Sequence, residues 1–100
     1  MAKGYWIVQV DVKNEEAMKP YVATNPAIHK KFGGRYLVMS NKCEVPEGSS
    51  RSRHVVIEFP DYVSALTCYR SPEYQANIKV RRPHAVADFV ILEGYDGPQP

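Results

Sequence analysis

The spacing of hydrophobic positions changes several times along this 100-residue chain, and each change marks the edge of a predicted element. Aromatic and β-branched residues dominate 4–12 and 54–59, a short apolar run lies within 35–40, and a nearly unbroken apolar run lies within 86–95. Runs of this composition are typical of β-strands. Residues 14–32 and the segment from 61 to 80 carry apolar residues at steps of three and four, the spacing of a helix that packs on one side. The pattern therefore predicts the order β-α-β-β-α-β.

The sequence marks the start and the end of the first helical segment, but two prolines interrupt its middle. Asn14 is placed to cap it, and Gly33 follows the last apolar position, where glycine tolerates the left-handed turn after a helix. Pro20 and Pro26 interrupt the apolar stripe, and proline lacks the amide hydrogen that a helix interior needs. We therefore expect either a kink in this helix or a restart with Asn25 as the new cap.

The second half of the chain is divided by similar signals. Residues 41–53 are rich in serine, glycine and proline and are predicted to form a loop, with a short edge strand at Lys42–Val45. Asp61 is placed to cap the second helix. Ser71 followed by Pro72 predicts a new helical turn, because a capping residue before proline favours a helix start.

This order of elements is that of the ferredoxin-like α+β fold, in which two helices cover one face of a four-stranded antiparallel sheet. The strands do not alternate cleanly between apolar and polar residues, as a half-solvated sheet would. The third strand places Val56 between His54 and Glu58 on the uncovered face, and Phe89–Leu92 is apolar throughout. Such a face marks a contact surface. We expect a homodimer in which two sheets pack through their open faces.

Length and composition narrow the class of protein. One hundred residues make a single domain, 1–100, with a tail at 96–100. The net charge of +2 is too small to indicate nucleic acid or an anionic membrane, and the apolar run at 5–10 is too short for a signal peptide or a bilayer span. Cys43 and Cys68 lack metal-binding or redox spacing and indicate free thiols in a reducing cytoplasm. No clustered ligands are present, so no metal or cofactor is expected.

Glu58 is the first candidate for chemistry, because a carboxylate inside an apolar strand needs a partner. Arg35, at the start of the neighbouring strand, is the natural one. In one interpretation Glu58 is a general base and Arg35 binds an anionic group of the substrate. In the other, the two form a structural ion pair that braces the sheet. His54 lies on the same face and is either a second catalytic candidate or a solvent-facing residue, and Glu93 is a weaker carboxylate candidate.

A second set of candidates would bind substrate. Tyr69, Ser71 and Tyr74 place three hydroxyl groups around a helix break, with Asn25 opposite them on the first helix. The free amides of a helix start suit Ser71 for anion binding, but Ser71 serves equally well as a cap and the tyrosines as packing residues. Trp6 either lines an aromatic pocket or contributes to the dimer interface.

Four segments together resemble the domain of unknown function 1330 family, a group of small, mostly bacterial proteins: Gly33–Val38, Val55–Pro60, Cys68–Gln75 and Glu93–Tyr95. The resemblance extends over Lys3–Gly97. It implies a ferredoxin-like fold of the dimeric α/β-barrel kind, which cofactor-free monooxygenases, haem-handling proteins and isomerases share. It implies no catalytic residues, because no activity is established for the family.

Two functions remain open at this point. The first is a pocket that binds or transforms a small organic molecule without a cofactor, with proton abstraction by Glu58 as its chemistry. The second is a non-catalytic dimeric module with a structural or regulatory role. A site needs a pocket with converging polar groups. If Glu58 only braces the sheet, we expect Glu58→Gln to cost about 3–5 kcal/mol by leaving Arg35 unpaired.

Overall fold

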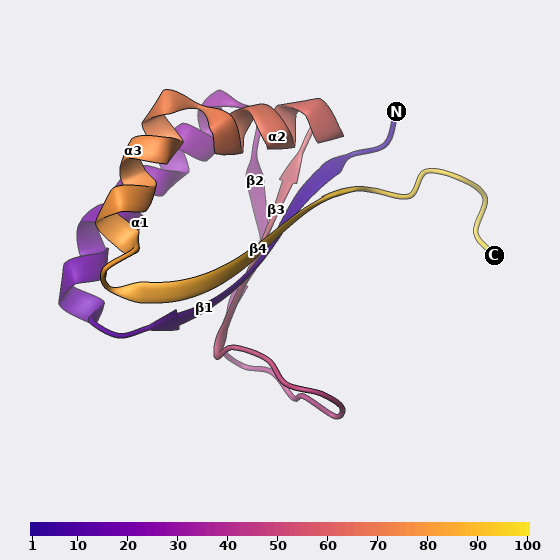
Figure 1. Cartoon of the computed structure of the whole chain (residues 1–100). Helices are drawn as coiled ribbons and strands as arrows, with labels where there is room; N and C mark the ends of the chain where they lie inside the picture. The colour runs from indigo at the N-terminus through magenta and orange to yellow at the C-terminus, as the bar shows by residue number, and fades with distance from the viewer.

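Seven elements follow one another in the computed structural model, which describes all residues 1–100. They are β1 (Gly4–Val12), α1 (Glu15–Lys31), β2 (Arg35–Ser40), β3 (Arg53–Phe59), α2 (Tyr62–Arg70), α3 (Pro72–Arg81) and β4 (Ala85–Glu93). The strands form one antiparallel sheet in the order β2-β3-β1-β4. All three helices lie on the same side of it (Figure 1). The predicted ferredoxin-like α+β fold is therefore confirmed.

The three predicted helix caps are present. The side chains of Asn14, Asp61 and Ser71 each accept a hydrogen bond from the amide three residues later, at 3.1, 2.7 and 3.2 Å. Such bonds satisfy amides that have no partner within the helix. Ser71 also ends α2, so the second helical region is divided where the sequence predicted it.

Helix α1 runs through Pro20 and Pro26 without interruption, so the predicted restart at Asn25 is wrong. Each proline removes the bond to the carbonyl four residues earlier. Both residues that carry those carbonyls are exposed, so water can replace the missing amide. Asn25 is not a cap, because its Oδ1 accepts a hydrogen bond from Nδ2 of Asn77 on α3 at 2.8 Å.

A glycine turn ends α1 and fixes the position of its last inward residues. Gly33 has a φ of 80°, in the left-handed region that favours glycine. The amide of Gly34 donates to the carbonyl of His29 at 2.8 Å, and that of Gly33 donates to Lys30 at 3.0 Å. This is the Schellman arrangement, which satisfies the final carbonyls of a helix. It turns the chain directly into β2.

The connection from β2 to β3 differs in part from the prediction. It is an exposed segment, 41–52, and the predicted edge strand at Lys42–Val45 is absent. The segment projects from the side of the sheet opposite the helices (Figure 1). Its end is held against that side by Arg51, whose guanidinium pairs with Asp11 at 3.0 Å and Asp88 at 2.8 Å.

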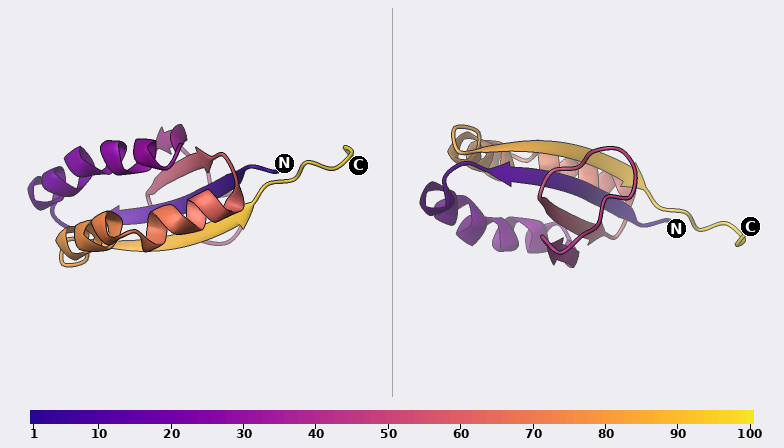
Figure 2. Two further views of the ribbon diagram at one scale, coloured as in Figure 1. Left: turned by 90° about the horizontal axis from the view of Figure 1, so that it is seen from above. Right: turned by 90° about the horizontal axis from the view of Figure 1, so that it is seen from below.

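The core lies between the helices and the sheet, and the other face of the sheet is open. Alternate strand residues such as Trp6, Ile57 and Phe59 point to the helices and are buried. No helix covers the opposite face, where segment 41–52 lies in front of the strands (Figure 2, right). Val90 and Leu92 are 49% and 45% exposed on this face. The predicted mixed, partly apolar surface is therefore present.

Candidate functional site

A cavity of about 230 Å³ lies between α1 and the helix-facing side of the sheet. Thirteen of its 17 lining residues are hydrophobic. A one-residue irregularity in β2, between Tyr36 and Val38, brings both Tyr36 and Met39 to this side, because an extra residue in a strand re-aims the side chains that follow it. Apolar cavities that contain a few polar groups are typical ligand sites. We refer to this space as the helix-side cavity.

His29 is the most unusual polar residue of the helix-side cavity. Its side chain is 2% exposed. Nδ1 lies 2.5 Å from the hydroxyl oxygen of Tyr36, whereas Nε2 is buried and has no hydrogen-bond partner. A buried polar atom without a partner is destabilising and rare in native proteins. The free Nε2 therefore requires an explanation beyond packing.

The ring of His29 is held by aromatic neighbours. The Trp6 ring meets it edge to face, with 4.8 Å between ring centres and 87° between planes. The indole nitrogen of Trp6 in turn donates to the carbonyl oxygen of Ala65 at 2.9 Å. Phe59 packs against Trp6 at 5.4 Å between ring centres. These contacts leave the imidazole little freedom to rotate away from the cavity.

Burial controls the protonation of the site. It lowers the pKa of His29 to about 4, because the dry surroundings disfavour the imidazolium. Burial, reinforced by Tyr21 and Cys68, raises the pKa of Tyr36 to about 12. At neutral pH the hydrogen-bonded pair of His29 and Tyr36 is therefore uncharged.

A second polar group lies between α1 and α3. The hydroxyl oxygens of Tyr21 and Tyr74 are 2.5 Å apart. Burial, followed by the influence of Tyr21, raises the pKa of Tyr74. Nearby, Nδ2 of Asn77 donates to the backbone carbonyl of Tyr21 and to the side chain of Asn25. Because these groups bond to one another, they hold the two helices together. Among the side chains that line the cavity, His29 is the one with a buried polar atom that lacks a partner.

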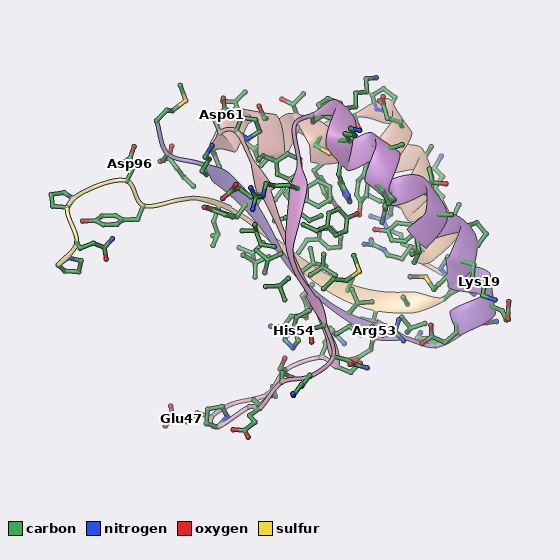
Figure 3. The ribbon with its side chains drawn as sticks, turned by 180° about the vertical axis from the view of Figure 1, so that it is seen from behind. Lys19, Glu47, Arg53, His54, Asp61 and Asp96 are labelled. Carbon is green, nitrogen blue, oxygen red and sulfur yellow. The ribbon has the colours of Figure 1, made fainter.

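Arg53 lies at the entrance of the helix-side cavity, beside exposed lining residues such as Val22 and Met39. Its guanidinium forms an ion pair with Glu15 in the first turn of α1. Figure 3 shows Arg53 and His54 where segment 41–52 joins the sheet, with Glu47 near the far end of that segment. Arg53 is the one lining residue with a full charge at neutral pH.

A model of a known protein family, the domain of unknown function DUF1330, matches residues 3–95 of the chain. The chain belongs to the DUF1330 family. The resemblance seen in the sequence is thereby confirmed. Among curated proteins, none matches the sequence.

Solved structures share the fold of this DUF1330 chain at low sequence identity. Methylated RPA0582 has a TM-score of 0.77 and 13% identity over 98% of this chain and 84% of its own; RPA0582 is a protein of unknown function from Rhodopseudomonas palustris. SnoaB, a cofactor-independent oxygenase from Streptomyces nogalater, has a TM-score of 0.65 and 11% identity over 100% and 97%. A protein of unknown function from Bacteroides thetaiotaomicron, a possible oxidoreductase, has a TM-score of 0.54 and 10% identity over 92% and 97%. At such identities the likeness establishes the fold alone.

The predicted substrate-binding residues of the DUF1330 chain are only partly brought together. Trp6, Tyr74 and Asn25 line the helix-side cavity. Ser71 caps α3 and also donates to the carbonyl of Cys68 at 2.7 Å, which is the structural alternative foreseen for it. Tyr69 lies outside the lining and packs against Trp6 at 5.9 Å between ring centres.

The predicted catalytic residues lie on the other face of the sheet. Glu58 accepts a hydrogen bond from the Tyr5 hydroxyl at 3.1 Å, and its carboxylate is 3.9 Å from Nε of Arg35. Burial and the Glu58 carboxylate raise the pKa of Tyr5. His54 Nε2 lies 3.1 Å from the Ser50 hydroxyl. The sheet separates these residues from Trp6 and Tyr74, so the single site predicted from the sequence is not assembled.

The Arg35–Glu58 pair is present but looser than predicted. Its 3.9 Å separation is too long for a bidentate hydrogen-bonded pair. The Arg35 side chain is 73% exposed, whereas that of Glu58 is 21% exposed. The closer partner of Glu58 is Tyr5, which the sequence reasoning did not assign to it. Glu93, the weaker carboxylate candidate, is exposed at the end of β4.

The side chains and helices of the DUF1330 chain meet neither the requirements of a metal site nor those of a membrane-spanning helix. No three His, Cys, Asp or Glu side chains are clustered so that they could hold a metal ion. None of the helices combines the length and apolar character needed to span a bilayer. The side chains of the helix-side cavity offer hydrogen bonding, proton transfer and aromatic packing.

Proposed function

We propose that this protein binds a small aromatic molecule that carries a hydroxyl group in the helix-side cavity. The observation that carries the proposal is His29, which lines the cavity and whose Nε2 is buried without a partner. A ligand in the cavity reaches this nitrogen by displacing a neighbouring side chain. A ligand that bonds to this nitrogen removes the energetic penalty of leaving it unpaired. The main proposal is that the protein binds this ligand, and transformation of the bound ligand is an extension of it.

The size and lining of the cavity favour a ring. An apolar cavity of roughly 150 Å³ is enough to hold benzene, and this cavity measures about 230 Å³. One substituted ring therefore fits. The aromatic side chains of Trp6, Tyr74 and Phe89 line the space and offer edge and face contacts to such a ring.

The hydrogen bond of His29 favours a hydroxyl group on that ring. When Nδ1 donates to Tyr36, Nε2 has a free lone pair and accepts a hydrogen bond from the ligand hydroxyl. When Tyr36 donates to Nδ1, Nε2 carries the hydrogen and donates it. A hydroxyl group suits both arrangements because it both donates and accepts, whereas a carbonyl suits only the second.

Transformation without a cofactor is the chemical extension of this proposal. His29 would take the hydroxyl proton on Nε2, leaving a phenolate beside an imidazolium. Its low pKa makes it a weak base in the empty cavity, so the step depends on the attraction between the two new charges. The fold is shared with SnoaB, a cofactor-independent oxygenase. 4-Nitrophenol, which changes colour on losing its proton, tests the step at about pH 5, where the free phenol is protonated and His29 is still neutral. A phenolate band on binding supports the step, and an unchanged spectrum of the bound ligand opposes it.

Trp6 provides a direct test of binding, because it is the single tryptophan of the chain and lines the cavity. We expect phenol to change the fluorescence of Trp6 in a saturable way. His29→Leu should weaken this binding at least about tenfold, the effect of one hydrogen bond to a buried group. His84→Leu is the matched control, since His84 lies outside the cavity lining. A wild-type protein that fails to bind phenols, or a His29→Leu variant that binds them equally well, contradicts the proposal.

The open face of the sheet supports a second function, a dimeric module in the cytoplasm. Val38, Val90 and Leu92 leave an apolar surface that a second copy would cover through a two-fold contact. Cys43 and Cys68 are both free, which suits a reducing compartment. Light scattering at micromolar concentration should give twice the monomer mass, and Leu92→Glu should give the monomer. A monomeric wild-type protein would end the dimer proposal without affecting the cavity.

A further inference from the structure

We propose that the ligand of the helix-side cavity is an aromatic acid, whose carboxylate pairs with Arg53 at the entrance. This inference rests on the proposed function and names the class of ligand more closely. It follows from the charge of the residues that line the cavity, among which Arg53 is positive and none is negative.

Arg53 interrupts an apolar pattern at an inward position. Residues of β3 alternate between the two faces, and Arg53 shares the helix-facing side with Val55, Ile57 and Phe59. It pairs in register with Val10, which also lines the cavity. A charged side chain at an inward strand position departs from the pattern that burial requires. A negatively charged ligand group at the entrance accounts for this departure.

The ion pair between Arg53 and its present partner, Glu15, is weak. Glu15 and Arg53 are 65% and 42% exposed, and ion pairs in that setting contribute little to stability. Glu15 belongs to the first turn of α1, where the helix dipole stabilises it whether or not Arg53 is present. A ligand carboxylate can therefore replace Glu15 at the guanidinium, whose planar fork matches a carboxylate.

A second guanidinium, that of Arg81, adds positive potential beside the cavity. Arg81 is 6% exposed, forms none of the ion pairs of the molecule, and has no hydrogen-bond partner for Nε or Nη1. Its Cζ lies 4.8 Å from the ring centre of Phe89 and 5.6 Å from that of Tyr21, and both rings line the cavity. A buried charge without a counter-ion exerts its field through a medium of low dielectric constant. No carboxylate lines the cavity to cancel this field.

The two polar ends of the cavity are separated along β1. His29 contacts Trp6, whereas Arg53 pairs with Val10, four residues further along the strand. Four residues correspond to about 13 Å of strand, part of which the long arginine side chain spans. The ligand should therefore carry its hydroxyl and carboxylate at opposite ends of the ring, as in 4-hydroxybenzoate.

The test compares two ligands of nearly the same shape, 4-hydroxybenzoate and the neutral 4-hydroxybenzamide, by calorimetry at neutral pH. We expect the wild type to bind the acid about tenfold more tightly, as a hydrogen-bonded charge pair provides. Arg53→Gln should remove most of this preference and Arg53→Lys part of it, while both variants still bind the amide. Glu15→Gln should increase the preference, because it removes the competing carboxylate. Arg70→Gln, which makes the same charge change at an exposed residue of α2, should leave the preference unchanged.

The position of the two ligand groups is tested by 2-hydroxybenzoate, which should bind more weakly than the 4-hydroxy acid because it cannot reach both ends. Equal binding of 4-hydroxybenzoate and its amide to the wild type overturns the inference but leaves the proposed function standing. An acid preference that survives in Arg53→Gln overturns the assignment to Arg53. A protein that binds neither these ligands nor phenol refutes the proposed function itself.

Discussion

The two faces of the sheet differ in whether their polar groups have hydrogen-bond or ion-pair partners. On the open face the polar groups satisfy one another: Tyr5 donates to Glu58, and Arg51 pairs with Asp11 and Asp88. On the helix-covered face His29 is buried with one ring nitrogen unpaired. A satisfied polar network needs no ligand to explain it, whereas an unpaired buried atom does. A ligand is therefore expected in the helix-side cavity and not beside Glu58.

The largest expected effect contrasts neighbouring residues of β3 that point to opposite faces. Ile57→Ala, on the helix-covered face, should lower the free energy of unfolding by about 2–5 kcal/mol, because Ile57 is 2% exposed in the core. Val56→Ala, on the half-buried open face, should lower it by less. Urea denaturation of both variants at one dilute protein concentration measures the difference. Equal losses would show that the open face is as tightly packed as the core.

The next effect concerns the pH dependence of stability. His29 has a pKa of about 4 in the folded protein and the ordinary value of 6.5 in the unfolded chain, so the unfolded chain binds the proton more strongly between these values. The stability that neutral His29 permits is complete above about pH 6.5 and is lost as the pH falls toward 4. The loss is of the order of 3 kcal/mol, at about 1.4 kcal/mol per pH unit.

Urea denaturation between pH 7 and pH 4 measures this loss in the wild type and in His29→Leu. In His29→Leu the free energy of unfolding should fall less steeply between pH 7 and pH 4, while His84→Leu should keep the wild-type dependence on pH. A His29→Leu variant with the wild-type pH profile would show that the imidazole is not buried in neutral form.

A smaller effect is expected on the open face. Glu58→Gln should lower the free energy of unfolding by less than about 1 kcal/mol, because Arg35 is exposed and stays solvated without its partner. The glutamine oxygen can still accept the bond from Tyr5. This value corrects the 3–5 kcal/mol expected if Glu58 braces the sheet against a buried Arg35. A loss in that higher range would restore Glu58 as a structural centre of the sheet.

The smallest effect is one of reactivity rather than stability. Burial, with a contribution from Glu73, raises the pKa of the Cys68 thiol to about 12. Cys43 is exposed in segment 41–52. Because thiolates are the reactive form, a thiol reagent should modify Cys43 and leave Cys68 intact until the protein unfolds. Mass spectrometry of the modified protein identifies the site, and early labelling of Cys68 would indicate opening of the α2 region.

Local signals in the sequence were enough to predict most of the fold. The bounds of β1 and β2 agree with their predicted ranges, because charged Lys13 follows the first apolar run and the second lies between Gly34 and the polar loop that begins at Asn41. The caps Asn14, Asp61 and Ser71 depend only on the next three residues and were also predicted. The restart at Asn25 was wrong: α1 continues through both prolines, and the two carbonyls that they leave without an amide belong to exposed residues that water can reach.

The cavity could be predicted only in part, because its key contacts join distant elements. Trp6, Tyr74 and Asn25 were identified from their residue types. His29 was not among the predicted site residues, although it lies four residues after Asn25 and three before Phe32, on the inward stripe of the same helix. That spacing could have placed it inside. Its pairing with Tyr36 depends on the glycine turn and the irregularity in β2, which spacing alone does not reveal.

Nitrogen NMR of the histidine side chains, with and without phenol, tests most directly whether His29 is the ligand-binding group. The chain has three histidines, so His29→Leu assigns the signal of His29. We expect His29 to be neutral at pH 7. Only its Nε2 resonance should shift strongly when phenol binds, while the resonances of His54 and His84 should not shift. A charged His29, or a phenol-bound protein in which the His29 resonances do not move, would contradict the account.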